Sequence, residues 1–518
     1  MNMNLLCTAV LGACLLLTGC ATIGPDFEQP EVDVAGNWLE AGNPNVDTTQ
    51  IEYRDWWNVF NDPVLNELTD HAYNQNLTLR VAGLRILEAR AELGFVTGLR
   101  FPQSQSVQAS AVRSRSSENA PPFSNLPPAI GDNIDPSVNS WSTSFDIAWE
   151  ADVWGKFRRG IEAADANLAA KMLNYDAVLV SLTGDVALTY TTIRTLELRL
   201  AYTRENVTLQ QRGLELAQDR FELGVTSELD VQQSLSLLNS TQSLIPFLEM
   251  NIRRAKNVLS LLLGMPPSDL ENILGSAGTL PVAPLQAAVG IPADLIRRRP
   301  DVRAAEMAAA AQSAAIGVSE AELYPQFVLA GSIGLAGETF SDQFDSGSGT
   351  GFVTPFVNWN IFNYGRIKNN VRVQDARFQQ LVVNYQNVVL NAAREVEDGL
   401  VGFLRAQEEV GYLEQAVTAA QRAVELSFDQ YDVGLVDYQR VLNSQASLLQ
   451  QQDSLADGQG RIVSSFVSTY RALGGGWQLR EGNTYVDTNT LETMRNRTDW
   501  GDLLDDQTEP AHLAPASP

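Results

Sequence analysis

Side chains suited to catalysis are few in this chain of 518 residues. His71 and His512 are its only histidines. We find no glycine-rich phosphate loop, no zinc-ligand spacing and no nucleophile elbow. The 62 Asp and Glu residues are spread over predicted helix faces, where solvation is their usual role. The sequence therefore predicts no enzymatic activity, no cofactor and no metal site.

Cys20 is the side chain with the most specific predicted chemistry. It ends the motif Leu17-Thr18-Gly19-Cys20, which follows an apolar run from Leu5 to Leu17 that is too short to span a bilayer as a mature helix. This segment resembles a bacterial lipoprotein signal, although Met1 to Asn4 lacks the usual Lys or Arg. The resemblance implies cleavage before Cys20 and acylation there, and Ala21 favours sorting to the outer membrane. The alternative is an ordinary secretory signal or a chance apolar start.

Charge and cysteine content narrow the class of partner. A formal net charge of −26 argues against a nucleic-acid partner, because neutralising phosphates requires clustered Lys and Arg. Cys7 and Cys14 would leave with the signal, so the mature chain would hold no pair for a disulfide. Fold stability must therefore come from buried side chains, and an apolar content of 44% is typical of a globular protein.

Two similar glycine motifs organise the rest of the chain. Arg220 to Gln233 contains Gly224, and Gln430 to Leu442 contains Gly434, which lies 210 residues later. An aromatic residue stands three positions before each glycine. We interpret both motifs as turns between antiparallel helices.

Charged residues follow both turns at matching positions. Asp230 and Arg440 each stand six residues after their glycine, and Asn443 stands nine residues after Gly434. Their opposite charges suggest that Asp230 and Arg440 tie neighbouring helix pairs together. The alternative is two solvated surface charges, because an exposed pair contributes only about 0 to 1 kcal/mol.

Very long helices are predicted on either side of these turns. Lys156 to Leu223 contains no proline, and as one helix it would extend roughly 100 Å at about 1.5 Å per residue. After Gly224, aliphatic residues recur at intervals of seven, which is the pattern of coiled-coil association. Pro246 lies inside this return segment and is expected to kink or loosen it. The positions of the repeat are Val231, Leu238, Ile245, Ile252 and Leu259.

Two regions show the period of two that is typical of strands. Residues 101–152 are predicted to form one β-hairpin and residues 325–362 a second one, with Gly337 to Gly351 as the loop of the second. Each strand has the length that a tilted strand needs to cross a bilayer. Four strands cannot close a barrel alone, and an open edge cannot face lipid. The chain must therefore oligomerise, or the sheet is soluble.

The second half of the chain repeats the order of the first. The offset of 210 residues pairs Trp149 with Trp359 and carries the aliphatic repeat to Val441, Leu448, Leu455 and Ile462. Upstream of the hairpins the offset becomes 223, which pairs Phe101-Pro102-Gln103 with Tyr324-Pro325-Gln326. An internal duplication explains both offsets.

At this point the chain resembles the TolC-like outer membrane factors, in particular the lipoprotein branch that serves resistance-nodulation-division efflux pumps. The resemblance covers nearly the whole mature chain. The segments that carry it are Trp56 to Leu65, Gly290 to Glu306, Tyr324 to Phe327 and Leu473 to Trp477.

The resemblance implies a mainly helical fold with membrane strands. Each chain of a homotrimer would give four strands to a twelve-stranded outer-membrane β-barrel and its long helical hairpins to a periplasmic α-barrel. The expected divisions are a signal peptide (1–19), a lipid anchor and extended tether (20–55), two structural repeats (56–289 and 290–477), and a belt segment with an acidic, disordered tail (478–518). The tail from Trp500 onward is expected to be disordered, and order is expected to begin near Trp56. The resemblance also implies that Pro25 to Phe60, Met265 to Pro292 and the segment after Trp477 form a belt around the middle of the tunnel.

The resemblance also implies a function, namely the passive exit duct of a tripartite efflux pump in the bacterial outer membrane. Its partners would be outer-membrane lipids, a periplasmic membrane-fusion adaptor and an inner-membrane pump. The turns would be adaptor-docking tips, at Gly224, Val225, Gly434 and Leu435. Asp230, Arg440 and Asn443 would form the periplasmic gate, although relatives commonly carry an aspartate in place of Asn443.

Two other functions remain open at this stage. The exit duct of a type I protein-secretion system has the same fold, but the lipoprotein signal and the Leu473 to Trp477 motif favour efflux. A periplasmic coiled-coil scaffold lipoprotein, whose hairpins never enter the membrane, is the alternative from another class.

Overall fold

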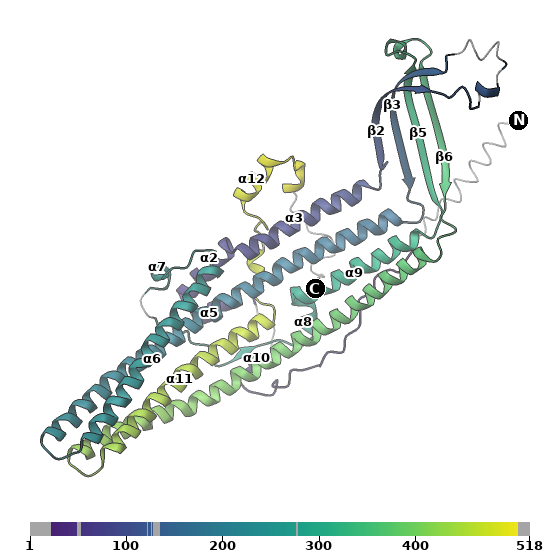
Figure 1. The fold of residues 1–518 in the computed structure, drawn as a ribbon. Helices are drawn as coiled ribbons and strands as arrows, with labels where there is room; N and C mark the ends of the chain where they lie inside the picture. Colours follow the sequence, from purple (N-terminus) through teal and green to yellow (C-terminus); the bar gives the residue numbers. More distant parts are fainter. Residues whose placement is uncertain are drawn as a thin grey trace.

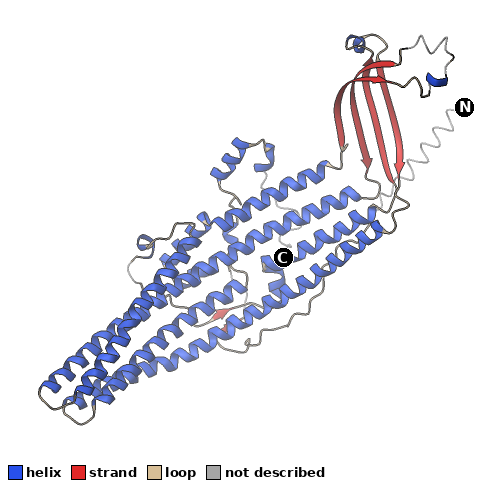
Figure 2. Ribbon diagram, in the orientation of Figure 1, coloured by secondary structure: helices blue, strands red, loops and turns tan. Residues whose placement is uncertain are grey.

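The computed structural model describes residues 22–48, 53–121, 123–125, 127, 135–275 and 278–505. Long helices form an extended layer, and a β-sheet continues this layer at one end. The two turns that connect the long helices lie at the other end (Figure 1). Figure 2 shows the four long strands gathered at that one end. The predicted signal peptide, Cys20 and residues 506–518 lie outside the described residues.

The helices of the first half follow their sequence signals. Helix α2 (Pro63–Gln75) begins with Pro63, and the Asp62 carboxylate accepts from the backbone N–H groups of Val64 and Leu65 at its start. Helices α3 (Leu77–Gly98), α5 (Lys156–Glu222) and α6 (Glu228–Leu262) follow. Helix α6 runs through Pro246 without interruption.

The second half repeats these helices with the same lengths. Helix α9 (Pro300–Ala321) has 22 residues, as α3 does. Helix α10 (Arg366–Asp432) has 67 residues, as α5 does, and α11 (Tyr438–Ala472) has 35, as α6 does. A short helix, α8 (Ala293–Arg298), precedes α9. The duplication predicted from the sequence offsets is therefore visible in the fold.

The sheet contains β2 (Ser104–Arg115), β3 (Ser137–Ala151), β5 (Gln326–Gly337) and β6 (Gly349–Asn358), all antiparallel and in the order β2-β3-β5-β6. Both predicted hairpins are present. The limits of β6 differ from the prediction, because the strand begins inside the expected loop and ends before Trp359. The loops carry the short 3₁₀ helices η2 (Phe123–Asn125) and η3 (Ser341–Phe344).

One face of the sheet is apolar from edge to edge. Phe145 pairs with Val107 on one side and with Ile333 on the other, and side chains paired in this way share a face. All three side chains are exposed in the single chain. The opposite face carries Ser144 and Asp146. On β3 the alternation predicted from the sequence thus separates an apolar face from a polar one, whereas β6 adds Phe352 and Phe356 to the second face.

The strands and the helices keep the same lateral order. Each strand is joined by a short connection to one helix, and these helices lie side by side as α3, α5, α9 and α10 (Figure 1). Three tryptophans form hydrogen bonds at the junction of sheet and helices. The indole Nε1 of Trp149, Trp154 and Trp359 donates to a backbone carbonyl at 3.2, 2.8 and 3.0 Å. Nearer the turns the lateral order is α6, α5, α11 and α10.

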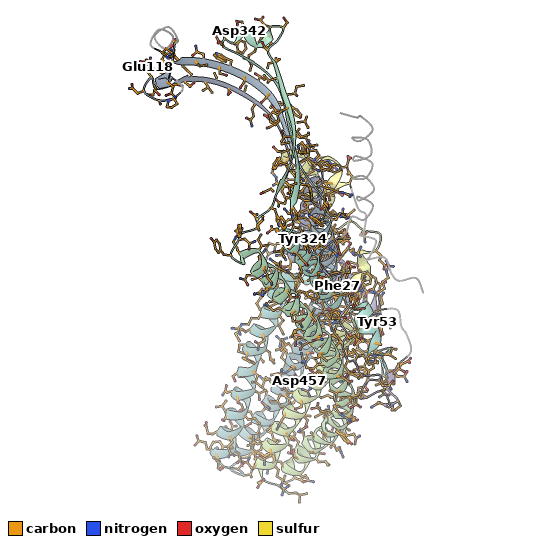
Figure 3. The ribbon with its side chains drawn as sticks, turned by 90° about the vertical axis from the view of Figure 1, so that its right-hand side faces the viewer. Phe27, Tyr53, Glu118, Tyr324, Asp342 and Asp457 are labelled. Atoms are coloured by element: carbon orange, nitrogen blue, oxygen red, sulfur yellow. The ribbon has the colours of Figure 1, made fainter. Side chains whose placement is uncertain are left out.

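Short segments cover the middle of the helical layer, and we call them the belt: residues 22–60, 265–292 and 477–505, as far as they are described. The belt contains β1 (Val46–Asp47) paired with β4 (Ala287–Ala288), and it buries Trp38, Trp56 and Trp57 in the main core. Figure 3 places Phe27 and Tyr53 on the same side of the layer, with Tyr324 where sheet and helices meet and Asp342 beyond the sheet. The remaining elements of the belt are η1 (Trp56–Phe60), α7 (Glu271–Leu274), η4 (Trp477–Arg480), α12 (Thr488–Arg497) and η5 (Gly501–Leu504).

Two expectations about order were wrong. The tether is structured from residue 22, because its backbone and side chains bind α10: Leu39 N donates to Glu397 and the side-chain amide of Asn45 donates to Gln407. The first residues of the predicted tail are also structured, since η5 buries Leu504 against the core. In both places one or two large apolar side chains hold an otherwise polar segment in place.

No helix in the described ranges is both long enough and apolar enough to cross a lipid bilayer.

Candidate functional site

The two glycine motifs form the same turn at the far end of the molecule from the sheet. Gly224 N donates to Phe221 O and Val225 N donates to Arg220 O, at 2.9 and 3.0 Å. This pair of bonds is the Schellman motif that ends many helices. Gly434 and Leu435 make the equivalent bonds to Tyr431 O and Gln430 O, at 2.9 and 2.8 Å. We call the two turns the tips.

Both tips require glycine at the same position. Gly224 and Gly434 each have a φ of +73°, a left-handed conformation that is unfavourable for residues with a Cβ atom. Nothing lies within 4 Å of the place where a Cβ of Gly224 would stand. Backbone conformation, and not lack of space, therefore accounts for glycine there.

The side chains next to the glycines are apolar and exposed. Val225 and Leu435 are 61% and 75% accessible, and Leu223 and Val433, just before the glycines, are exposed as well. Exposed apolar side chains at the end of a helical hairpin favour contact with another protein surface. The predicted docking residues are thus together at one end of the molecule.

Arg220 links the two tips within one chain. Its guanidinium Nη1 donates to the carbonyl oxygens of Tyr431 and Asp432, at 3.0 and 2.8 Å, and its Cζ lies 4.7 Å from the centre of the Tyr431 ring. These carbonyls belong to the last turn of α10, where the helix dipole favours a positive charge. We call this set of contacts the tip latch.

A small apolar cluster lies behind the tip latch. The Tyr431 and Tyr438 rings are 4.9 Å apart, and the Tyr438 hydroxyl shares a hydrogen bond of 2.9 Å with the Ser234 hydroxyl on α6. Ala217, Val441 and Leu442 complete the buried part of the cluster. Burial raises the pKa of Tyr438 to about 12, so its hydroxyl stays protonated at neutral pH. Both helices of the first helical hairpin, α5 and α6, thereby pack against the second helical hairpin, α10 and α11.

The structure does not join the two charges predicted to form the gate. Asp230 accepts a hydrogen bond from the hydroxyl of Thr226 in its own turn, and no ion pair among the described residues of one chain connects it to Arg440. The Arg440 side chain is exposed, and Asn443, also exposed, accepts from the Gln439 amide. If Arg440 ties helix pairs together as predicted, it must do so through contacts outside its own chain, for example with another copy.

Sequence reasoning gave no role to Arg220, Tyr431 or Tyr438. The sequence did contain a sign of their role, because the two repeats differ at these positions. At the offset of 210 residues, Arg220 corresponds to Gln430, Tyr431 to Phe221 and Tyr438 to Glu228. That signal becomes useful only once the two tips are known to lie side by side.

No group of three or more His, Cys, Asp or Glu side chains among the described residues is placed to hold a metal ion. The tips present exposed apolar side chains at two turns and a set of contacts between the helices of the two hairpins.

Comparison with known proteins decides the family. The profile of the family described as "Outer membrane efflux protein" matches residues 68–265 and 291–475, which include both pairs of long helices. The chain belongs to the outer membrane efflux protein family. The resemblance stated from the sequence, and with it the expected role as an efflux channel of the outer membrane, is confirmed.

Named relatives of this efflux protein cover nearly its whole length. The "Solvent efflux pump outer membrane protein SrpC" of Pseudomonas putida is 30% identical over 482 residues, which are 90% of this chain and 98% of SrpC. The "Outer membrane protein OprJ" of Pseudomonas aeruginosa is 29% identical over 475 residues, which are 91% and 96% of the two chains.

Solved structures confirm the predicted fold class. The outer-membrane channel OprN superimposes with a TM-score of 0.81 at 30% identity, covering 88% of this chain and 100% of the OprN chain. The CmeC outer membrane channel of Campylobacter jejuni gives a TM-score of 0.82 at 21% identity, a likeness of fold, covering 91% and 100% of the two chains.

Proposed function

We propose that this chain is the exit duct of a tripartite efflux pump. In this proposal three copies form a closed ring that crosses the outer membrane and conducts small toxic compounds passively. The energy and much of the selectivity come from an inner-membrane pump of the resistance-nodulation-division type, reached through a periplasmic adaptor. The observation that carries the proposal is the common lateral order of strands and helices, which leaves two open edges in one chain.

The first open edge is formed by β2, α3 and α6, and the second by β6 and α10. Strand edges present unpaired N–H and C=O groups, which lipid cannot satisfy. Joining the first edge of one copy to the second edge of the next is a head-to-tail contact, and such contacts close into rings. Three copies of four strands make twelve, an even number within the range of outer-membrane barrels.

Exposed apolar side chains on both helical edges support this contact. On α6 they follow one face over five turns: Leu244, Phe247, Met250, Val258 and Leu261. On α10 they recur at spacings of 7 and 11 residues: Val383, Leu390, Val401 and Tyr412. A long apolar stripe facing water would be costly in a monomer, because roughly 25 cal/mol is lost for each exposed Å². Contact between copies removes both stripes from water.

Aromatic side chains at both ends of the apolar sheet face support membrane insertion. At the outer end, Phe340 packs against Trp141 and Phe344 with ring centres 5.7 and 5.6 Å apart. At the junction with the helices, Trp149 and Trp359 are exposed. Trp141 and Trp149 are eight residues apart, about 26 Å along a strand, which is comparable to the apolar band of an outer-membrane barrel.

The start of the described chain supports a lipid anchor at Cys20. Ile23 N donates to Trp154 O at 3.1 Å, and the buried Arg159 guanidinium donates to Ile23 O, Gly24 O and the Asp26 carboxylate. Residues 23–26 are thereby fixed beside the junction of sheet and helices. Three extended residues span about 10 Å, so acyl chains on Cys20 would enter the membrane next to the barrel wall.

We further propose that the tips are the docking and gating end of the duct. Val225 and Leu435, beside Gly224 and Gly434, would contact the adaptor through their exposed apolar side chains. Asp230, Arg440 and Asn443 would act between copies to hold the closed state. Planar-bilayer conductance of the Arg440→Ala channel tests this role, and a closed state that leaks no more than the unaltered one would count against it.

The experiment that tests the exit duct uses the full chain purified from outer membranes. We expect a detergent-resistant trimer by sizing with light scattering, ion conduction in planar bilayers, and greater sensitivity to dyes and detergents on deletion of the gene. A monomer released by salt or buffer without detergent would instead identify a peripheral scaffold.

A further inference from the structure

A cleft of about 600 Å³ lies between α3, α5 and the end of α6. It opens on the face of α5 that carries Lys171, Asn174, Ser181 and Asp185, at spacings that place them on one side of the helix. The opposite side of α5 faces the belt, where the Asp176 carboxylate accepts from Arg480 at 2.7 Å. With the belt on the outer side of the ring proposed above, the cleft faces the interior of the duct, and this assignment rests on the proposed function.

Two cations face each other across this cleft. Helices α3 and α5 are antiparallel, and the place of a Cβ on Gly160 lies 3.4 Å from the Val96 side chain. Counting eleven residues from that contact along each helix brings Arg85 opposite Lys171, and both line the cleft. Neither forms an ion pair among the described residues. Two like charges that line one cleft on facing helices, neither of them in an ion pair, favour an anion between them.

The one carboxylate that lines the cleft does not neutralise this pair. Asp185 binds Arg471 on α11 at 2.8 Å. It lies fourteen residues from Lys171, about 21 Å along the helix. Arg85 and Lys171 therefore lie at one end of the cleft and Asp185 at the other. This local pair of positive charges stands in a chain whose net charge is −26.

The rest of the lining is apolar with a few neutral polar groups. Ala82, Val178, Leu182 and Leu262 provide the apolar surface, and Asn174 and Ser181 provide hydrogen-bonding groups. Pockets of this size that combine apolar walls with a small number of charged groups are typical binding sites for small organic molecules.

We propose that this cleft binds organic anions with an apolar body, such as aromatic sulfonates or carboxylates, and holds them at Arg85 and Lys171 on their way through the duct. The anionic group lies between the two cations, and the apolar body rests on Ala82 and Val178, the nearest apolar residues of the lining. The cleft thereby gives the inner wall of an acidic chain a local preference for anions.

The test uses the full-length protein in lipid nanodiscs, with naphthalene-2-sulfonate as the probe and isothermal titration calorimetry against empty nanodiscs. We expect saturable binding of this anion. Naphthalene-2-methanol has the same apolar body without the charge. It is expected to bind at least about tenfold more weakly, because charge-assisted hydrogen bonds are lost. This comparison needs no variant.

Variants then locate the site. Arg85→Gln with Lys171→Gln is expected to weaken sulfonate binding about tenfold or more, whereas Arg85→Lys with Lys171→Arg retains it. The matched control, Arg212→Gln with Lys368→Gln, removes two exposed charges outside the cleft and is expected to change nothing.

Equal affinity for the neutral probe, no saturable binding beyond empty nanodiscs, or unchanged binding after Arg85→Gln with Lys171→Gln would overturn the proposal. Binding is measured without conduction, so its outcome is distinct from that of the proposed function. A protein that binds the anion but conducts no ions would refute the duct and leave the cleft as a binding site. A conducting trimer without the binding would refute only the cleft.

Discussion

Replacing Arg220 by alanine is expected to separate the two tips within each chain. The substitution removes two hydrogen bonds to the carbonyls of Tyr431 and Asp432 and a cation–π contact with the Tyr431 ring. Hydrogen bonds that involve a charged group contribute about 1.5 to 3 kcal/mol each when well shielded, and a cation–π contact at an exposed site about 0.5 to 1. Arg220 is only partly buried, which reduces these values.

We therefore expect the tip latch to contribute about 2 kcal/mol to local stability. Amide hydrogen exchange followed by mass spectrometry measures this quantity, because the amides of the tips exchange through local opening. A loss of about 2 kcal/mol corresponds to roughly 30-fold faster exchange in peptides that cover residues 217–236 and 428–445. Exchange in the sheet and in the belt is expected to stay unchanged.

Arg212→Ala is the matched control, since Arg212 lies two turns earlier on α5 with an exposed side chain. If Arg220→Ala leaves exchange at both tips unaltered, or if Arg212→Ala accelerates it equally, the latch does not couple the tips and this reasoning fails. An effect confined to the first tip would show that Arg220 stabilises only its own turn.

Four further predictions follow from single contacts. Gly434→Ala forces a Cβ into a left-handed turn and should destabilise the tip by about 1 to 2 kcal/mol, read from amide exchange, whereas a stable tip would contradict the assigned strain. Tyr438→Phe removes the hydrogen bond to Ser234 and should lower local stability by about 1 kcal/mol in the same assay. Arg159→Ala should expose residues 22–30 to limited proteolysis, and unchanged cleavage would show that other contacts hold the segment. Cys20→Ser should remove the acyl mass seen by mass spectrometry, and a retained acyl group would exclude Cys20 as its site.

The long helices could be predicted because their signals are local. Proline at the start of α2, the absence of proline from Lys156 to Leu223 and the glycine after each long helix depend only on backbone geometry. The faces of the hairpin strands followed from alternation, since a shift by one residue would turn every apolar side chain to the other face. Comparing the halves at constant offsets then fixed which elements correspond.

The resemblance implied which segments form the belt, but the contacts that hold the belt and the tip latch could not be predicted from the residues themselves. Residues 22–48 are rich in Gly, Pro, Asn and Asp, yet Trp38 is buried and donates to Gly290 O at 3.0 Å, a contact across 252 residues. Arg220 likewise acts on Tyr431 in the other repeat. Such contacts depend on which segments the fold brings together, and neither periodicity nor composition carries that information.

The shared lateral order of strands and helices has a consequence for the width of the duct. Each chain contributes four strands at one level and four helices at the next, so a closed ring of three copies has twelve of each. Neighbouring strands lie about 4.8 Å apart, or about 6 Å around a barrel of strongly tilted strands, whereas helices lie about 8 to 10 Å apart. Twelve helices therefore enclose a tube about one and a half times as wide as twelve strands do. In the proposed ring, the wall would step outward at the tryptophans of the junction, and the helical part would form a chamber between a narrower neck in the membrane and the tips.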